Sequence, residues 1–140
     1  MNICYNCVDR HVDNGKGAEP AFYYDSAYTG VQEMFTFRQV QENVAKMATM
    51  FKEKFGVTKG DRVLIYMPMV PPAAWAMLAC ARIGAIHSVV FGGFAAKELA
   101  NRIDDCAPKL IVTCSAGIEP RKVIKYSPIV DEALSLCVKV

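Results

Sequence analysis

The sequence predicts an α/β fold in which helices cover a parallel sheet. Three short apolar runs, residues 62–67, 86–91 and 109–113, have the length and branched side chains of buried strands. Two helix-forming segments, residues 73–83 and 95–106, separate them. Because helices of this length join strands by right-handed crossovers, the alternation favours parallel pairing. A chain of 140 residues is expected to form one core.

A lead-in of different character precedes these elements. Residues 3–12 have the pattern of a short helix, and the Gly/Asn/Asp-rich cluster at 13–17 is typical of a helix stop and turn. Two aromatic-rich runs, residues 21–24 and 34–37, flank the turn residues 26–30. This arrangement predicts an antiparallel hairpin.

The helix after the hairpin is amphipathic and carries a signal at each end. Thr36 is a candidate N-cap, with Gln39 three residues later as in a capping box. Apolar residues recur at helical spacing from Phe37 to Phe55, and Gly56 ends the pattern. We therefore expect a helix that buries one face and leads into the strand at 62–67.

The helices between and after the strands differ in polarity. The pair Pro71-Pro72 suits a first helical turn, and the residues up to Ile83 are almost all apolar before Gly84 ends the helix. Such a helix should be buried on several sides. The helix at 95–106 is amphipathic, and a last helix is expected at about 127–136.

Charge and hydropathy exclude two classes of partner. Sixteen Lys and Arg against fourteen Asp and Glu give a net charge of +2 without a basic block, so no nucleic-acid partner is expected. No apolar stretch reaches the roughly 18 residues of a membrane span, so no membrane partner is expected. The N-terminus has neither signal-peptide nor transit-peptide character.

The six cysteines favour packing over metal binding. Only Cys4 and Cys7 form a C-x-x-C pair, and neither histidine has zinc-finger spacing, so no metal site is expected. The spacing of the pair fits one face of the first helix. Cysteines in apolar contexts, such as Cys80 and Cys114, act as small hydrophobes in a reducing compartment, here the cytosol or mitochondrial matrix.

Candidate binding residues follow the strands, since open parallel sheets bind ligands outside the carboxyl ends of their strands. The segments concerned are residues 67–71, 92–94 and 115–122. In the second, Gly92 and Gly93 can let the backbone approach a ligand and turn helix N–H groups toward an anion, although a plain tight turn is the simpler explanation. The G-x-G-x-x-G spacing of a dinucleotide site is missing.

The third segment is basic at its end, where Arg121, Lys122 and Lys125 cluster. An arginine there can hold a phosphate through two N–H groups, but charged runs are usually just solvated, so both interpretations stay open. His87 lies in an apolar strand without a nucleophile beside it, which favours a hydrogen-bonded core histidine. No P-loop, Ser-His-Asp order, H-E-x-x-H motif or carboxylate pair is present, so no catalytic residue is assigned.

Three strings are more specific than any pattern above: Asn2 to His11, Gly60 to Met69, and Met77 to Phe94. All three resemble short-chain acyl-CoA synthetases, the acetyl- and propionyl-CoA synthetases of the adenylate-forming ligase superfamily. The similarity continues through Ala100–Asp105 and Ile118–Pro120 and covers essentially the whole chain. The strings Gly117–Pro120 and Tyr24–Ser26 look closer to the propionate-preferring mitochondrial relatives.

The resemblance implies a two-step reaction for the parent enzyme. Acetate or propionate attacks ATP to give an acyl-adenylate and pyrophosphate, with Mg²⁺ neutralising phosphate charge, and the CoA thiol then displaces AMP. It further implies that residues 1–140 are an N-terminal fragment of the Rossmann-like large domain, with a lead-in at 1–34 and the first α/β segment at 35–140. The ATP loop, acyl pocket and C-terminal lid would lie downstream, so the fragment is expected to be inactive alone and to bind no cofactor tightly.

By position, the resemblance assigns one edge of the CoA site to two groups of residues. One resembles the loop that binds the 3′-phospho-ADP portion, and the other resembles the turn beside the CoA adenine. They are Glu119, Pro120, Arg121 and Lys122, and Phe91, Gly92 and Gly93. Relatives read Glu-Pro-Gly-Arg in the first group, so either Arg121 or Lys122 is the phosphate-binding cation. The alternative is a free-standing CoA- or nucleotide-binding module without catalysis.

Overall fold

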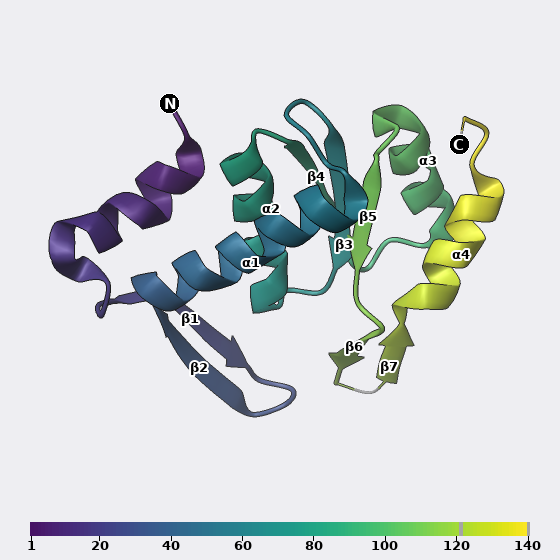
Figure 1. Cartoon of the computed structure of the whole chain (residues 1–140). Helices are drawn as coiled ribbons and strands as arrows, with labels where there is room; N and C mark the ends of the chain where they lie inside the picture. Colours follow the sequence, from purple (N-terminus) through teal and green to yellow (C-terminus); the bar gives the residue numbers. More distant parts are fainter. Residues whose placement is uncertain (121, 140) are drawn as a thin grey trace.

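The computed structural model describes residues 1–120 and 122–139, and it confirms the predicted α/β class with a parallel sheet (Figure 1). Three strands form that sheet in the order β4-β3-β5. The central strand β3 (Arg62–Met67) pairs in parallel with β4 (Ile86–Phe91) and with β5 (Leu110–Thr113). Local sequence pattern was therefore sufficient to place all three strands of this sheet.

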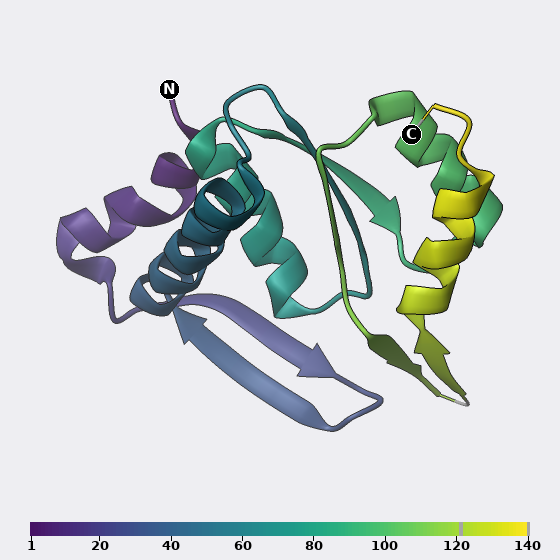
Figure 2. The same cartoon turned by 45° about the vertical axis from the view of Figure 1, so that its right-hand side comes forward.

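Helices cover the two faces of the sheet in pairs, with α1 and α2 on one side and α3 and α4 on the other (Figure 2). Along β3, Val63, Ile65 and Met67 join the core of the first pair, whereas Leu64 and Tyr66 join the core of the second. This alternation is the two-residue period of a strand, and it leaves β3 buried on both faces. The helices are α1 (Phe37–Phe55), α2 (Pro71–Ile83), α3 (Ala96–Cys106) and α4 (Tyr126–Leu136).

The predicted signals at the helix ends are confirmed. The Gln39 N–H donates to Thr36 Oγ1 at 3.3 Å and the Thr36 N–H donates to Gln39 Oε1 at 2.8 Å, which completes the capping box of α1. Gly56 and Gly84 end α1 and α2 with φ of 62° and 76°, a left-handed conformation that glycine adopts without steric cost. No helix in residues 1–120 and 122–139 is long and apolar enough to cross a membrane.

The lead-in contains the predicted helix and hairpin. The helix is π-helical, in two parts, η1 (Tyr5–Asp9) and η2 (Val12–Lys16), and Gly15 interrupts the second part with φ of 82°. The strands β1 (Pro20–Ser26) and β2 (Val31–Thr36) pair in antiparallel fashion. In both ribbon views this hairpin lies at the bottom of the molecule, and β2 leads into the start of α1 (Figures 1 and 2).

The expectation that Cys4 and Cys7 share one face of the first helix is wrong. Cys4 is buried together with Val8, whereas Cys7 is exposed. The reason is geometric, because i to i+5 hydrogen bonding widens each turn and places the residue four positions later, rather than three, on the same face. The prediction that cysteines pack as small apolar residues in the core is confirmed for Cys4 and for Cys80, which is fully buried in α2.

The expectation that His87 on β4 is a core residue is also wrong. His87 is exposed rather than a core histidine, and on the same face Val89 and Phe91 are 55% and 69% exposed. The core beneath α1 and α2 includes no described side chain of β4, so this edge strand is covered mainly on its other face, where Val90 is buried. An apolar run predicts a strand, but it does not reveal how many faces are covered.

Candidate functional site

Two of the three segments selected from the sequence, residues 92–94 and 115–122, leave the same edge of the sheet. Strand β4 ends at Phe91 and is followed by Gly92 and Gly93, whereas β5 ends at Thr113 and is followed by a short hairpin. In the sheet register Met67 lies opposite Phe91, so the carboxyl ends of the strands are level. This edge is where a parallel sheet binds ligands, and it is the candidate site.

The hairpin after β5 replaces the loop that the sequence predicted. Strands β6 (Ala116–Glu119) and β7 (Lys122–Lys125) pair in antiparallel fashion, with Glu119 opposite Lys122. Pro120 follows β6 in the turn, while Arg121, the other candidate phosphate-binding cation, lies outside the described residues. The hairpin therefore presents Glu119, Pro120 and Lys122 at its tip, all exposed.

An ion pair joins the two charged residues at this tip. Lys122 Nζ lies 3.6 Å from Glu119 Oε2, and the two side chains are 66% and 44% exposed. Because exposed pairs of this kind contribute at most about 1 kcal/mol, the pair does not fix either side chain. Lys122 is thus a cation that an incoming anion can recruit from Glu119.

The glycine turn after β4 is needed for close packing. A methyl group at Gly92 would lie 2.5 Å from the Tyr126 hydroxyl oxygen and 2.9 Å from the Met67 carbonyl oxygen. One at Gly93 would lie 2.5 Å from the edge of the Phe91 ring. The close approach seen here is to groups of the protein itself, as a tight turn requires, and the approach of this backbone to a ligand stays a prediction.

Tyr126 connects the two segments, and no sequence motif points to it. It is 3% exposed at the start of α4, and a methyl group at Gly117 of the hairpin would lie 3.0 Å from its ring. The ring therefore lies between Gly92 on one segment and Gly117 on the other. The last helix, expected from about 127, starts at Tyr126, and the candidate segment that ended at residue 122 did not include this tyrosine.

A second tyrosine extends this cluster toward the sheet. The Tyr66 ring centroid lies 5.0 Å from that of Tyr126, and the Tyr66 hydroxyl donates to the Phe94 carbonyl oxygen at 2.6 Å. Burial raises the pKa of both phenols, and the nearby Cys114 sulfur acts in the same direction. For Tyr126 the charge of Glu119 raises the pKa further. Both hydroxyls are therefore protonated at neutral pH, and the single O–H of Tyr66 is already donated to Phe94.

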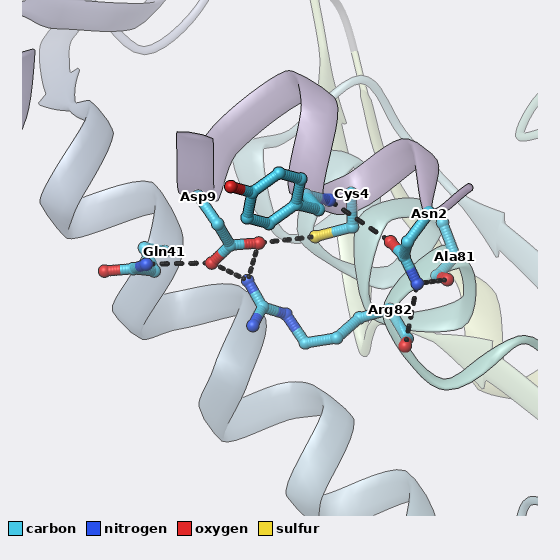
Figure 3. A network of polar contacts seen from close by, with 7 residues as sticks. Asn2, Cys4, Asp9, Gln41, Ala81 and Arg82 are labelled. Carbon is cyan, nitrogen blue, oxygen red and sulfur yellow. Dashed lines mark hydrogen bonds and ion pairs between the residues drawn. The ribbon is translucent and has the colours of Figure 1, made fainter. Parts of the chain in front are cut away.

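A different polar cluster lies near the opposite end of the sheet (Figure 3). Arg82 Nη2 donates to both carboxylate oxygens of Asp9, at 2.7 and 2.9 Å, and Gln41 Nε2 donates to Asp9 Oδ1 at 2.8 Å. Asn2 Nδ2 donates to the carbonyl oxygens of Ala81 and Arg82, at 3.0 and 3.2 Å. These bonds fasten the lead-in helix to α1 and α2, so the cluster has a structural explanation.

No part of the chain described by the structure gathers three or more His, Cys, Asp or Glu residues that could hold a metal ion. The exposed His87 lies near the beginning of β4, away from the carboxyl edge. The groups that the structure brings together are therefore a glycine turn, a hairpin with an ion-paired lysine, and two phenols. Such a set can bind an anionic or aromatic ligand, and it contains no nucleophile with an adjacent base.

Comparison with known proteins agrees with this arrangement. Acyl-CoA synthetase short-chain family member 3, mitochondrial, from Bos taurus and from Homo sapiens is 56% identical over 136 residues, which are 97% of this chain and 20% of the relative. Acetyl-coenzyme A synthetase from Rhizobium rhizogenes is 46% identical over 138 residues, 99% of this chain and 21% of the relative. The chain thus spans about a fifth of the length of these relatives.

The family match covers the sheet, its helices and both segments of the candidate site. The family described as AMP-binding enzyme matches residues 8–139, which leaves out only the first seven residues and the last one. The match includes the Gly92-Gly93 turn, the hairpin of β6 and β7, and Tyr126. The chain belongs to the AMP-binding enzyme family.

Proposed function

We propose that this chain is part of a short-chain acyl-CoA synthetase and supplies one edge of its CoA site. The reaction of the whole enzyme would convert acetate or propionate, ATP and CoA into acyl-CoA, AMP and pyrophosphate through an acyl-adenylate. The names of the relatives support the reaction class. The observation that carries the CoA assignment is that the Gly92-Gly93 turn and the hairpin of Glu119 and Lys122 meet around one buried ring, that of Tyr126.

The two segments suit different parts of CoA. Lys122 is exposed and only loosely paired with Glu119, so it can turn to the 3′-phosphate of the nucleotide. The Phe91 ring, 69% exposed beside the glycine turn, offers a flat apolar surface to adenine. The first turn of α3, which starts at Ala96 without a side-chain cap, adds free N–H groups near the same turn.

The remaining steps would require residues outside this chain. We assign none of the described residues to Mg²⁺, because they include no group of three or more potential ligands. The residues that bind the acyl chain and the adenylate, and the lid domain itself, would lie in the four fifths of the relatives' length that the chain does not match. A location in the cytosol or mitochondrial matrix accords with the mitochondrial name of the first relatives.

A titration of the ¹⁵N-labelled chain with CoA and with 3′-dephospho-CoA, followed by amide NMR signals, tests the assignment. We expect weak binding, with a Kd of about 1 mM, because only one edge of the site is present. The shifted signals should map to the Gly92 turn and to β6 and β7. Dephospho-CoA should bind about fivefold more weakly, since a charged hydrogen bond to phosphate is lost.

The Lys122→Ala variant provides the residue-level control. It should bind both compounds equally weakly, whereas Lys46→Ala, an exposed lysine on α1, should behave as the wild type. Amide signal shifts confined to other parts of the chain would overturn the assignment, and so would the absence of any shift at CoA concentrations well above the expected Kd. Micromolar affinity would instead favour a free-standing CoA-binding module.

A further inference from the structure

The hydroxyl of Tyr126 is an unusual group in this fold. The residue is 3% exposed, yet its hydroxyl makes no hydrogen bond to any residue in the described ranges 1–120 and 122–139. Its neighbour Tyr66 is as deeply buried, but the Tyr66 hydroxyl donates to the Phe94 carbonyl oxygen at 2.6 Å. The Tyr126 oxygen is not among the fully enclosed polar atoms that lack a partner, so it retains some contact with solvent and an acceptor from outside the described chain can reach it.

The position of that hydroxyl is defined by the two glycines. The oxygen is 2.5 Å from where a Gly92 Cβ would be and 3.5 Å from where a Gly117 Cβ would be. It therefore lies between the turn after β4 and the start of the hairpin, the two segments assigned to CoA. A bulkier residue at either glycine would displace it, so both small residues keep the oxygen in place.

A second unpaired hydroxyl lies at the same edge of the sheet. Thr113 Oγ1, at the end of β5, is enclosed without a hydrogen-bond partner within the described part of the chain. Thr113 is opposite Tyr66 in the sheet register, so it belongs to the face of the sheet that carries the two phenols. Unpaired hydroxyls thus gather at the carboxyl edge, where a ligand rather than the fold can supply the acceptor.

We propose that Tyr126 is a ligand-binding residue, whose hydroxyl donates a hydrogen bond to an acceptor atom of the CoA nucleotide held between the Gly92 turn and the β6–β7 hairpin. The proposal rests on the CoA assignment above and adds a residue to it. The phenol supplies a proton donor near Gly117, in the hairpin whose tip carries the cation Lys122. An adenine or ribose–phosphate moiety carries acceptor atoms for both groups. The raised pKa of Tyr126 keeps the proton on the hydroxyl over the working pH range.

The Tyr126→Phe variant separates hydrogen bonding from packing, because it keeps the ring between the two glycines and removes only the oxygen. We expect its Kd for CoA to be about three- to tenfold higher than that of the wild type, the effect of one hydrogen bond. Its thermal unfolding midpoint should stay close to that of the wild type, because the described part of the chain loses no hydrogen bond. Tyr23→Phe, which alters a phenol 72% exposed on the β1–β2 hairpin, should change neither quantity.

A spectroscopic measurement adds a readout that packing alone would not move. In the chain labelled with ¹³C at the tyrosine Cζ, saturating CoA should shift the Tyr126 signal and leave that of Tyr23 unchanged. If the wild type binds CoA but Tyr126→Phe binds equally tightly and the Tyr126 signal stays in place, this proposal is wrong while the CoA assignment stands. If the wild type itself fails to bind CoA, both are wrong.

Discussion

Both ends of the central sheet are rich in polar side chains, but the side chains at the two ends differ in how many hydrogen-bond partners they have within the protein. Near the amino ends of the strands, Asp9 accepts from Arg82 and Gln41. Asp61, just before β3, accepts from the Thr58 amide at 2.7 Å, the Thr58 hydroxyl at 2.8 Å and Lys109 Nζ at 3.0 Å. Each of these carboxylates is bound by at least one group from a distant part of the chain.

At the carboxyl ends the polar groups have few protein partners. The Glu119–Lys122 pair is long and exposed, and the hydroxyls of Tyr126 and Thr113 lack partners among the described residues. Glycine at position 92 lets the backbone lie close to the Tyr126 hydroxyl. The polar groups at the amino end therefore stabilise the fold, whereas the few partners at the carboxyl end accord with the ligand-binding role proposed above, since buried polar groups usually find partners within the protein.

The largest effect that follows from this comparison is expected at Arg82. The Arg82→Ala variant leaves the Asp9 carboxylate, whose side chain is only 14% exposed, without its cation. Removing one member of a buried pair typically costs about 3 kcal/mol of unfolding free energy. Urea denaturation measures this loss, and the Kd for CoA of the folded variant should stay unchanged.

Arg102→Ala is the matched control, because Arg102 is exposed on α3. It should lower the unfolding free energy by less than about 0.5 kcal/mol, as is usual for surface substitutions. A similar small loss for Arg82→Ala would mean that the Asp9 cluster does not hold the lead-in helix, and a raised Kd for CoA would mean that the two ends are not independent.

The Gly92→Ala variant should have the next largest effect. Its methyl group would meet the Tyr126 hydroxyl at 2.5 Å and the Met67 carbonyl at 2.9 Å, so the turn must shift. We expect a loss of about 2 kcal/mol, in the range of overpacked sites, together with weaker CoA binding. Gly93→Ala meets only the exposed Phe91 ring, which can rotate, and should cost less. Equal losses for the two variants would contradict a special role of Gly92.

Features set by local chemistry were predictable from the sequence. The capping box of Thr36 and Gln39 and the helix ends at Gly56 and Gly84 depend on residues a few positions apart, and the structure has them as expected. The three sheet strands follow from short apolar runs. Their parallel pairing follows because each connection contains a helix.

Features set by what packs against a segment were not predictable in this way. The exposure of His87 depends on which strand lies at the sheet edge and on how far α1 and α2 extend. Tyr126 is part of the site because α4 brings it back between two glycines that precede it by 34 and 9 positions in the chain. The CoA role of Glu119 and Lys122 came from a resemblance, and it stays a prediction.

Acidification should weaken the amino end of the sheet through Asp61. Its hydrogen bonds from the Thr58 amide, Lys109 and the Thr58 hydroxyl lower its pKa to about 2. A carboxyl group with a pKa of about 4 in the unfolded chain therefore contributes stability above that pH, and the contribution is lost as the pH falls from about 4 to about 2. Unfolding free energies of wild type and Asp61→Asn should converge over this window. A constant difference between them would contradict the assignment.

The smallest predicted effect concerns the carboxyl end and has the opposite sign to the others. Glu119 competes with any anion for Lys122, since their charged atoms lie 3.6 Å apart on an exposed hairpin tip. Glu119→Gln removes this competition and the repulsion between carboxylate and phosphate, so CoA should bind about twofold more tightly, with little change in stability because exposed pairs contribute so little. The gain should shrink at high salt and disappear in the Lys122→Ala background, where no cation remains to be released. A weaker affinity of Glu119→Gln would show instead that the carboxylate itself contacts the ligand, for example as an acceptor for ribose or adenine donors, and would make this hairpin tip a direct recognition element rather than a competing ion pair.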